Sequence, residues 1–387
     1  MRRRGGVELV GYLDAAVGGG ETARRYLGAL RVAGVGVRAR SVPLEGRDSA
    51  RTALPWGRWV PGRSIGFNVL CLNPEQMVPY LSSPDAPSRR NRMNVGVWAW
   101  EVDVVPSGWR AAAQRVAEVW ACSEFTARLI TAATGARAAG VLPPLPIIPL
   151  ASAAPVDLPP AFRVLAMFDY LSTTQRKNPV GAIEAYRAAF GPADGARMIV
   201  KSLNGVHRID ARREVERAAS GRADIILQDG TISGAERDAL VAGCDCLVSL
   251  HRSEGFGMQI AEAMSVGKPV VATAYGGNTE FMTAANSYLV NYEPTLVGPG
   301  CEHYDATASW AEPDVAQAAA ALRAIVDRPD EARNRAARGQ LEVNAMLAPA
   351  RIGGQMRDRL AALHADGPGA SSLEESVADP APAAEQH

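Results

Sequence analysis

Residues 249–273 read SLHRSEGFGMQIAEAMSVGKPVVAT. This pattern predicts an apolar strand, a glycine loop, a helix over 258–266 and a second strand that closes the stretch. Gly255 and Gly257 let the backbone approach a ligand closely, and the start of the helix presents unpaired amides to an anion. The stretch therefore predicts an anion-binding turn between two strands of a sheet.

Two glutamates accompany this turn. Glu254 precedes the helix, and Glu262 lies within it, eight residues further along the chain. A carboxylate beside a phosphate cannot bind that phosphate, so we expect both side chains to accept hydrogen bonds from hydroxyl groups. A diphosphate between two sugar rings fits this pattern. The alternative is a surface helix with two solvated acids, but such a helix would not require glycines at its start.

Apolar, β-rich runs alternate with helical stretches along the whole chain. Strands are predicted at 7–13, 35–42, 67–72, 93–99, 116–122 and 138–142, and again at 162–168, 198–202, 224–227, 246–250, 269–273 and 287–290. Helices are predicted at 21–33, 107–117, 123–134, 180–190, 208–219, 234–243, 258–266, 315–327, 329–347 and 352–364. This alternation is typical of parallel sheets wrapped by helices, so the expected fold class is α/β.

The length and a proline-rich stretch predict two domains. The 387 residues exceed the size of about 250–300 residues at which one hydrophobic core stops growing. We place a Rossmann-like domain at 1–150, a second at 151–349 and a disordered tail at 365–387, which is rich in Ala, Pro, Ser and Glu. Two such domains would face each other across a cleft lined by the carboxyl ends of both sheets.

The charge balance excludes one class of partner. Lys and Arg together number 41, as do Asp and Glu, so the formal net charge is zero. A nucleic-acid partner bound through a general basic surface is therefore not expected. No run approaches the roughly 20 apolar residues of a membrane-spanning helix, and no secretory leader is recognised, so we expect a cytoplasmic protein. The arginines at positions 2–4 could still contact a membrane surface.

The string EGFGMQIAEAMSVGKPVVAT, followed by YGGN at 275–278, resembles the signature of the family-four retaining glycosyltransferases. The resemblance is close over 160–295 and looser over 7–35 and 93–126. It implies the GT-B fold, in which two Rossmann-like domains face a central cleft and a C-terminal helix, here 350–364, packs back on the first domain. In that family the first glutamate meets the transferred sugar and the second holds the ribose of the nucleotide. The resemblance implies these roles for Glu254 and Glu262.

Basic residues follow two strands of the second half. The loop DYLSTTQRKNP, which starts at Asp169, is similar to the family loop that supplies cations to the donor diphosphate. Many relatives have Gly-Arg directly after the strand, whereas this chain has Phe168-Asp169, so the resemblance implies the role for Arg176 and Lys177 by proximity. Lys201 stands where the family keeps another basic residue. Such cations would stabilise the negative charge that gathers on the leaving nucleoside diphosphate.

The resemblance also implies a set of donor-binding residues. They lie in the GGG turn at 18–20, in the glycine loop and helix start, and after the strand at 224–227, where relatives hold the nucleobase largely through the backbone. The set comprises Gly19, Gly20, Gly255, Phe256, Gly257, Met258, Glu262, Gln228 and Asp229. Backbone recognition does not identify the base. Glu280 is either a site residue or an ordinary acid at a helix start.

The acceptor side is indicated by WAWEVD at 98–103. Trp100 could stack on a sugar, and Glu101 or Asp103 could meet an acceptor hydroxyl or amine. The alternative is an aromatic anchor that packs the loop. These acids, with Asp14 and Glu21, would suit a cationic acceptor.

Together these features predict a retaining glycosyltransferase that moves a hexosyl group from a nucleoside diphosphate sugar to a hydroxyl of a small-molecule or glycan acceptor. Relatives build envelope polysaccharides or modify natural products such as aminoglycosides. The chain contains no Asp-x-Asp pair, so we expect neither a metal ion nor another cofactor. A non-catalytic nucleotide-sugar-binding protein is the main alternative. An exported sugar-binding protein would need a signal segment, and the incomplete glycine fingerprint disfavours a dehydrogenase.

Overall fold

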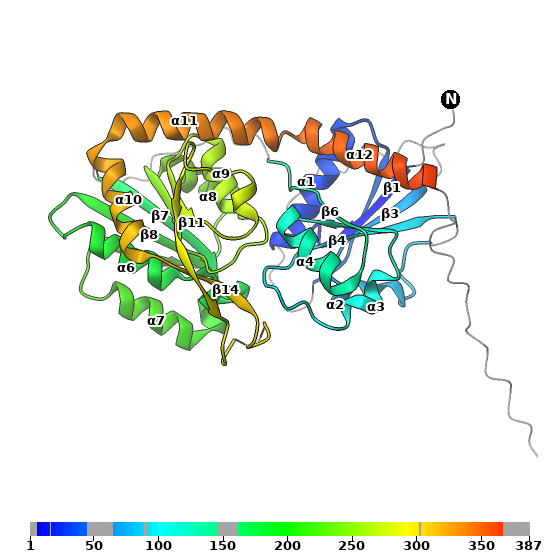
Figure 1. Cartoon of the computed structure of the whole chain (residues 1–387), viewed down its shortest axis with the longest axis horizontal. Coiled ribbons are helices and arrows are strands. Elements are labelled where there is room, and N and C mark those ends of the chain that lie inside the picture. Colours follow the sequence, from blue (N-terminus) through cyan, green and yellow to red (C-terminus); the bar gives the residue numbers. More distant parts are fainter. Residues whose placement is uncertain are drawn as a thin grey trace, which may run out of the picture.

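The computed structural model describes residues 6–15, 17–44, 65–88, 91–145, 161–301 and 303–366. Figure 1 shows two lobes side by side, with the long helices α11 and α12 running across both of them. Each lobe is built on a six-stranded sheet, and every strand pair within these two sheets is parallel. The predicted α/β class and the two doubly wound halves are confirmed.

The N-terminal sheet has the strand order β2-β1-β3-β4-β5-β6. Its strands are β1 (Gly6–Gly11), β2 (Val37–Ser41), β3 (Ile65–Cys71), β4 (Met93–Trp98), β5 (Glu118–Ala121) and β6 (Ala138–Gly140). Its helices are α1 (Gly18–Val32), α2 (Pro74–Leu81), α3 (Trp109–Ala113) and α4 (Glu124–Thr134). The bounds of α4 follow from its caps, because the Ser123 side chain accepts from the amide of Thr126 and Gly135 ends the helix at a φ of 74°.

The C-terminal sheet has the strand order β12-β11-β10-β7-β8-β9. Its strands are β7 (Phe162–Asp169), β8 (Ala196–Leu203), β9 (Ile225–Asp229), β10 (Cys246–Ser249), β11 (Val270–Thr273) and β12 (Tyr288–Val290). Helices α5 (Thr174–Lys177), α6 (Pro179–Ala189), α7 (Ile209–Ala219), α8 (Gly234–Gly243), α9 (Met258–Ser265) and α10 (Val315–Asp327) surround it, with the short 3₁₀ helices η2 (Tyr170–Ser172), η3 (Gly205–His207) and η4 (Gly277–Glu280). The strand order reverses between β7 and β10, which is where open α/β sheets bind ligands.

The structure differs from the sequence predictions mainly where an element is short. The helix expected over 107–117 covers only Trp109–Ala113, and the strand expected over 138–142 ends at Gly140. The antiparallel hairpin of β13 (Tyr292–Leu296) and β14 (Ser309–Pro313) was not expected. Most of the predicted linker at 142–160 and of the predicted tail at 365–387 lies outside the described residues.

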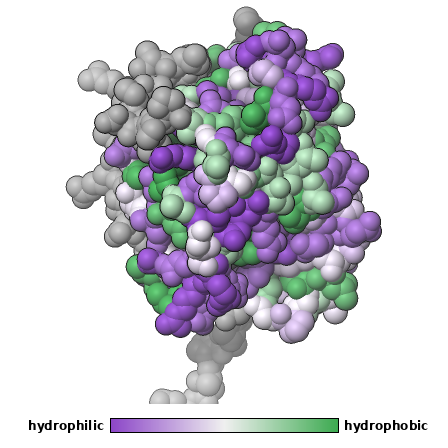
Figure 2. Space-filling model, turned by 90° about the vertical axis from the view of Figure 1, so that its left-hand side faces the viewer, coloured by the Kyte–Doolittle hydropathy of each residue, from purple (hydrophilic) through white to green (hydrophobic). Residues whose placement is uncertain are grey.

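The outer face of the C-terminal lobe mixes hydrophilic and hydrophobic residues in the view of Figure 2. This distribution is typical of helices that turn one face to solvent. None of the helices in the described parts of the chain is long and apolar enough to span a membrane.

Helices α11 (Pro329–Met346) and α12 (Pro349–Asp366) connect the domains. The apolar side chains of α12 belong to the N-terminal core with those of α1, namely Ile352, Met356, Leu360 and Leu363 beside Tyr26, Leu27 and Leu30. The two helices meet closely at Gly353, where a Cβ atom would lie 2.0 Å from the carbonyl oxygen of Ala29. A glycine is therefore required at the point where the chain returns to its first domain.

Replacing Gly353 by Ala should lower the free energy of unfolding by about 1–3 kcal/mol, because the added methyl group overpacks the contact with α1. The neighbouring Gly354 is the matched control, since a Cβ atom there meets only the end of the Arg357 side chain, at 4.0 Å. Gly354→Ala should raise stability by up to about 1 kcal/mol through helix propensity. Urea unfolding of both variants measures the difference, and effects of the same sign would contradict this packing.

Candidate active site

The loop between β10 and α9 is held in place by a second glycine turn. The amide of Gly277 donates to the carbonyl oxygen of Glu254 at 2.8 Å. A Cβ atom at Gly276 would lie 2.3 Å from that same oxygen, and one at Gly277 would lie 2.0 Å from the carbonyl oxygen of Gly255. Gly257 precedes α9 with a φ of 87°. The backbone on either side of Glu254 is therefore fixed by close contacts that only glycines permit.

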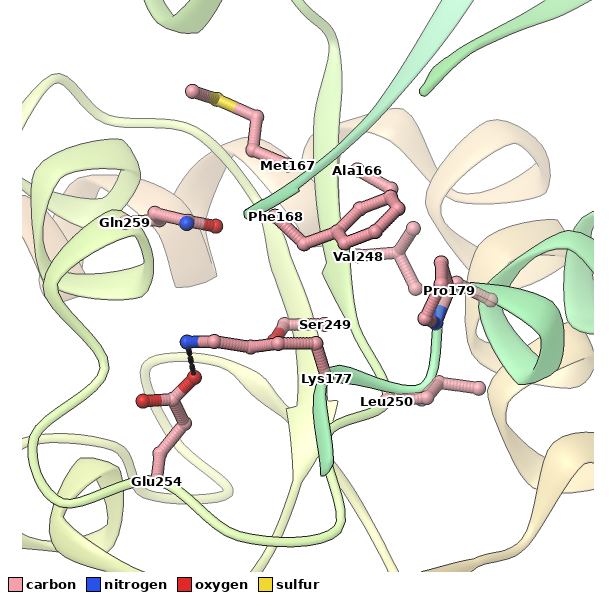
Figure 3. Close-up of a pocket in the computed structure, with 11 residues that line it drawn as sticks. Ala166, Met167, Phe168, Lys177, Pro179, Val248, Ser249, Leu250, Glu254 and Gln259 are labelled. Carbon is pink, nitrogen blue, oxygen red and sulfur yellow. Dashed lines mark hydrogen bonds and ion pairs between the residues drawn. The ribbon is translucent and has the colours of Figure 1, made fainter. Parts of the chain in front are cut away.

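The Glu254 carboxylate lies between two cations from the loop after β7. The Lys177 Nζ donates a hydrogen bond to Oε1 of Glu254, and Nη1 of Arg176 lies 3.4 Å from Oε2 of the same carboxylate. The same Nη1 donates to the carbonyl oxygen of Ser253 at 2.8 Å. Figure 3 shows the Lys177 side chain crossing the carboxyl end of β10 to reach Glu254. The structure thus brings together three of the predicted catalytic side chains.

Burial and charge act in opposite directions on this group. Burial raises the pKa of Glu254, but the charges of Lys177 and Arg176 outweigh it and lower the pKa to about 2. Burial lowers the pKa of Lys177, and Glu254 opposes that shift only in part. The carboxylate is therefore ionised over the whole physiological range, and its two cations are the reason.

Glu254→Gln should lower the free energy of unfolding by about 3 kcal/mol at pH 7, because Arg176 and Lys177 would stay buried without a carboxylate. The pKa of Glu254 is lowered from 4.5 to about 2. Its stabilising contribution is therefore complete above pH 4.5 and is lost as the pH falls toward 2. Urea unfolding should show a gap between the variant and the wild type that narrows from pH 7 to about pH 3.

The control for this measurement is Glu184→Gln on α6. Glu184 is exposed and makes no ion pair within the described residues. We expect this variant to match the wild type at both pH values. A gap for Glu254→Gln that stays equal at both pH values would contradict the lowered pKa.

Glu262 lies inside α9 and pairs with arginines of both domains. Arg25 of α1 donates to its Oε1, and Nη1 of Arg237 on α8 lies 3.4 Å away. The side chains of Arg25 and Glu262 are 4% and 2% exposed, so this ion pair between the domains is buried. Glu21 accepts from Nε of Arg25 at 2.7 Å and completes the group. Sequence reasoning missed Arg25, because nothing in the α1 pattern distinguishes it from a solvated arginine.

Arg25→Gln should lower the free energy of unfolding by about 3 kcal/mol, because Glu262 would lose one of its partners in the interior. Arg213→Gln on α7 is the control. That substitution removes a pair with Asp210 at 3.6 Å whose side chains are 68% and 95% exposed, and it should cost less than about 0.5 kcal/mol. Equal, small effects in urea unfolding would mean that α1 and α9 are not in contact in solution.

Lys201 does not join the group around Glu254. Its Nζ donates to the carbonyl oxygens of Ser202, at 2.7 Å, and of Gly230, and within the described residues its partners are all backbone oxygens. The prediction that Lys201 faces the diphosphate therefore has no geometric support in this arrangement. The cause is local, because the turn after β9 curls over the end of β8 and its carbonyls take up the ammonium group.

Asp229 lies on the other side of this turn and accepts hydrogen bonds from neighbouring groups of the same domain. Its Oδ1 accepts from the Ser202 hydroxyl at 3.0 Å and from the amide of Gly205 at 3.3 Å. With Tyr170, Asn204 and residues of α7, Asp229 lines a pocket of about 470 Å³ beside the ends of β8 and β9. Gln228, which precedes Asp229 at the end of β9, is half-buried.

The space beside Glu254 is small in this arrangement. The pocket lined by Lys177, Glu254, Gln259 and Phe168 has a volume of about 10 Å³, which is room for about one water molecule. Figure 3 shows Gln259 of α9 and Phe168 of β7 on one side of the Lys177 side chain and Glu254 on the other. Binding of a sugar at this position therefore requires the surrounding side chains or the two domains to move.

The glycine turn at the start of α1 contains two different positions. A Cβ atom at Gly20 would lie 2.5 Å from the carbonyl oxygen of Tyr12, whereas one at Gly19 meets nothing within 4 Å. Gly20 is therefore needed for packing of the turn. At Gly19, by contrast, a Cβ atom would enter open space, so packing does not require a glycine there.

The predicted acceptor residues lie where the two domains touch. Trp100 is 4% exposed and packs edge-on against Trp109 and Tyr304, with ring centroids 5.2 and 5.3 Å away. The alternative of an aromatic anchor describes the surroundings of Trp100, and its stacking on a sugar stays a prediction. Glu101 accepts from the Tyr304 hydroxyl at 3.0 Å, and Asp103 accepts from the amide of Ser309 at 2.7 Å.

Glu280 caps a helix of the other domain. Its Oε1 accepts from the amide of Phe125 in the first turn of α4 at 3.0 Å. Burial raises the pKa of Glu280, and the amides of α4 oppose that shift. Within the described residues, His, Cys, Asp and Glu side chains form no group of three that could hold a metal ion.

Comparison with known proteins finds a family match over the segment that contains three of these glutamates. Residues 229–294, which contain Glu254, Glu262 and Glu280, match the family described as glycosyl transferases group 1. No curated protein matches the sequence. The fold is GT-B. Together the family match and the fold indicate a glycosyltransferase.

Three solved structures illustrate the likeness of fold. Sucrose-phosphate synthase from Thermosynechococcus elongatus has a TM-score of 0.66 at 16% identity, over 94% of this chain and 100% of that one. HepE from Anabaena, in complex with UDP and glucose, has a TM-score of 0.62 at 15% identity, over 92% and 99%. TarM from S. aureus has a TM-score of 0.57 at 13% identity over 76% of this chain, which spans only 55% of TarM.

Proposed function

We propose that this protein is a retaining glycosyltransferase that moves a hexosyl group from a nucleoside diphosphate sugar to a hydroxyl of a small-molecule or glycan acceptor. The observation that carries the proposal is the ion group of Glu254, Arg176 and Lys177, in which Arg176 is buried and the other two side chains are only 13% and 16% exposed. It lies beside the start of α9 and between the ends of β7 and β10, where the order of the sheet reverses.

The donor diphosphate would bind where positive charge and unpaired amides converge. The loop that holds Glu254 leads directly into the N-terminus of α9, where helix amides lack intrahelical partners, and Arg176 and Lys177 pair with Glu254 beside it. As the sugar leaves, negative charge gathers on the nucleoside diphosphate, and fixed cations stabilise it. In this proposal, Arg176 and Lys177 do this work without a divalent ion.

Glu254 and Glu262 would then serve two parts of one donor. We assign Glu254 to the hydroxyls of the transferred sugar and Glu262 to the ribose, since both carboxylates are hydrogen-bond acceptors held in place by cations. A ribose at Glu262 would compete with Arg25 for the carboxylate, so donor binding and the contact between α1 and α9 would be coupled.

In the proposed reaction, cleavage of the bond between the sugar and the diphosphate runs ahead of attack by the acceptor. The acceptor oxygen attacks the same face of the sugar, and its proton passes to the departing phosphate oxygen. The solved structures of HepE with UDP and glucose, and of TarM with UDP and alpha-GlcNAc-glycerol, support a donor of this class. Closure of the domains would exclude water and limit hydrolysis of the donor.

The test is a screen of nucleoside diphosphate sugars and acceptors, with products identified by mass spectrometry. We expect transfer by the wild type and a loss of about 100-fold or more for Glu254→Gln, the range seen when one electrostatic stabiliser is removed. Glu184→Gln should retain full activity. Donor binding without transfer or hydrolysis across the panel would replace the proposal with a non-catalytic nucleotide-sugar-binding protein.

A further inference from the structure

The hairpin of β13 and β14 extends from the C-terminal domain onto the N-terminal one. Side chains of its loop and base share one apolar cluster with N-terminal tryptophans, namely Val297, Cys301, Tyr304 and Trp310 with Trp98, Trp100 and Trp109. In Figure 1 the hairpin lies at the lower edge of its lobe, on the side that faces the other lobe. The hairpin therefore contacts the N-terminal domain at the cleft.

Tyr304 is the residue of this loop with a polar contact to the predicted acceptor segment. Its ring is 7% exposed and packs edge-on against Trp100. Its hydroxyl donates a hydrogen bond to Oε2 of Glu101 at 3.0 Å. Asp103 is held by the same hairpin, but through the backbone amide of Ser309. Of these two contacts between described residues, the one with Glu101 depends on a side chain of the hairpin.

Glu101 is connected to the catalytic group by a short chain of hydrogen bonds. The Ser253 hydroxyl donates to the carbonyl oxygen of Glu101, and the carbonyl oxygen of Ser253 accepts from Arg176. Burial lowers the pKa of Arg176, but the neighbouring Tyr304, Glu101 and Glu254 outweigh it and raise the pKa. Tyr304 and Glu101 therefore stand within electrostatic reach of the residues assigned to the donor.

The second carboxylate oxygen of Glu101 has a different environment. Within the described residues, Oε1 makes no hydrogen bond or ion pair, and Glu101 is only half-buried. One oxygen is thus fixed by Tyr304, while the other remains able to accept a hydrogen bond from a ligand. The position fits the acceptor, because Glu101 belongs to the N-terminal domain and adjoins the group that would hold the transferred sugar.

We propose that Tyr304 is a positioning residue that orients the Glu101 carboxylate to accept a hydrogen bond from the acceptor. The proposal rests on the function proposed above and adds a residue of the C-terminal domain to the acceptor subsite. The tyrosine hydroxyl restricts the carboxylate to one orientation, so less entropy is lost when the acceptor binds.

The test is Tyr304→Phe, which keeps the ring in the apolar cluster and removes only the hydroxyl. With a donor and an acceptor from the screen, we expect the acceptor KM to rise by up to about tenfold, because the acceptor would then have to order the freed Glu101 carboxylate when it binds. The donor KM and the rate of donor hydrolysis without acceptor should stay unchanged. Glu101→Gln should also raise the acceptor KM, and the double variant should be no worse than the worse single variant.

Tyr80→Phe is the matched control. Its hydroxyl donates to the carbonyl oxygen of Asp85 at 3.1 Å, an exposed contact in the N-terminal domain. We expect wild-type kinetics for this variant, and a Tm for Tyr304→Phe close to that of the wild type.

Three outcomes separate the possibilities. An unchanged acceptor KM in Tyr304→Phe overturns the assignment of Tyr304 while leaving the glycosyltransferase intact. An equal change in the donor KM and in donor hydrolysis also overturns it, because the hydroxyl would then support the whole site. A wild type that turns over no donor overturns the proposed function itself, and this inference with it.

Discussion

The ion group of Glu254, Arg176 and Lys177 is the interaction on which the site depends. Each of these charges would be costly to bury alone; the Glu254 carboxylate stabilises both cations, and they stabilise it in turn. Their mutual contact ties the loop after β7 to the loop after β10, across the point where the sheet order reverses. The glycines at 276 and 277 then pack on the second loop and hold its backbone. The result is a charged group whose backbone is held by close contacts.

The two domains complete this site through contacts that are polar and specific. Arg25 reaches Glu262, Glu280 caps α4, and Tyr304 reaches Glu101, each across the domain boundary. Helix α12 adds an apolar contact on α1. Because the polar pairs depend on the relative placement of the domains, a ligand that competes for one of them would change the others. In the proposed function, donor binding would therefore be coupled to the arrangement of the domains.

Sequence reasoning worked where the signal was local. The glycines around Glu254, the capping Ser123 and the alternation of strands and helices gave the fold and most helix bounds, because caps and periodicity depend on near neighbours. It did not anticipate the contacts of Lys201 and Trp100, whose residue types suit a ligand and whose neighbours in space are backbone oxygens and aromatic rings. A basic or aromatic residue at a strand end looks the same in the sequence whether it contacts a ligand or packs within the protein.

The sequence by itself determined two doubly wound halves and a glycine turn with glutamates at its start and within its helix. These follow from hydrophobic period and backbone freedom, which a short window of sequence contains. Only the tertiary structure decided which partners those glutamates have. Arg25 and Glu262 are 237 residues apart, and Glu101 and Tyr304 are 203 apart. Such pairs form because two separate domains and a hairpin bring them together in a buried space, where an ionised group must find a partner.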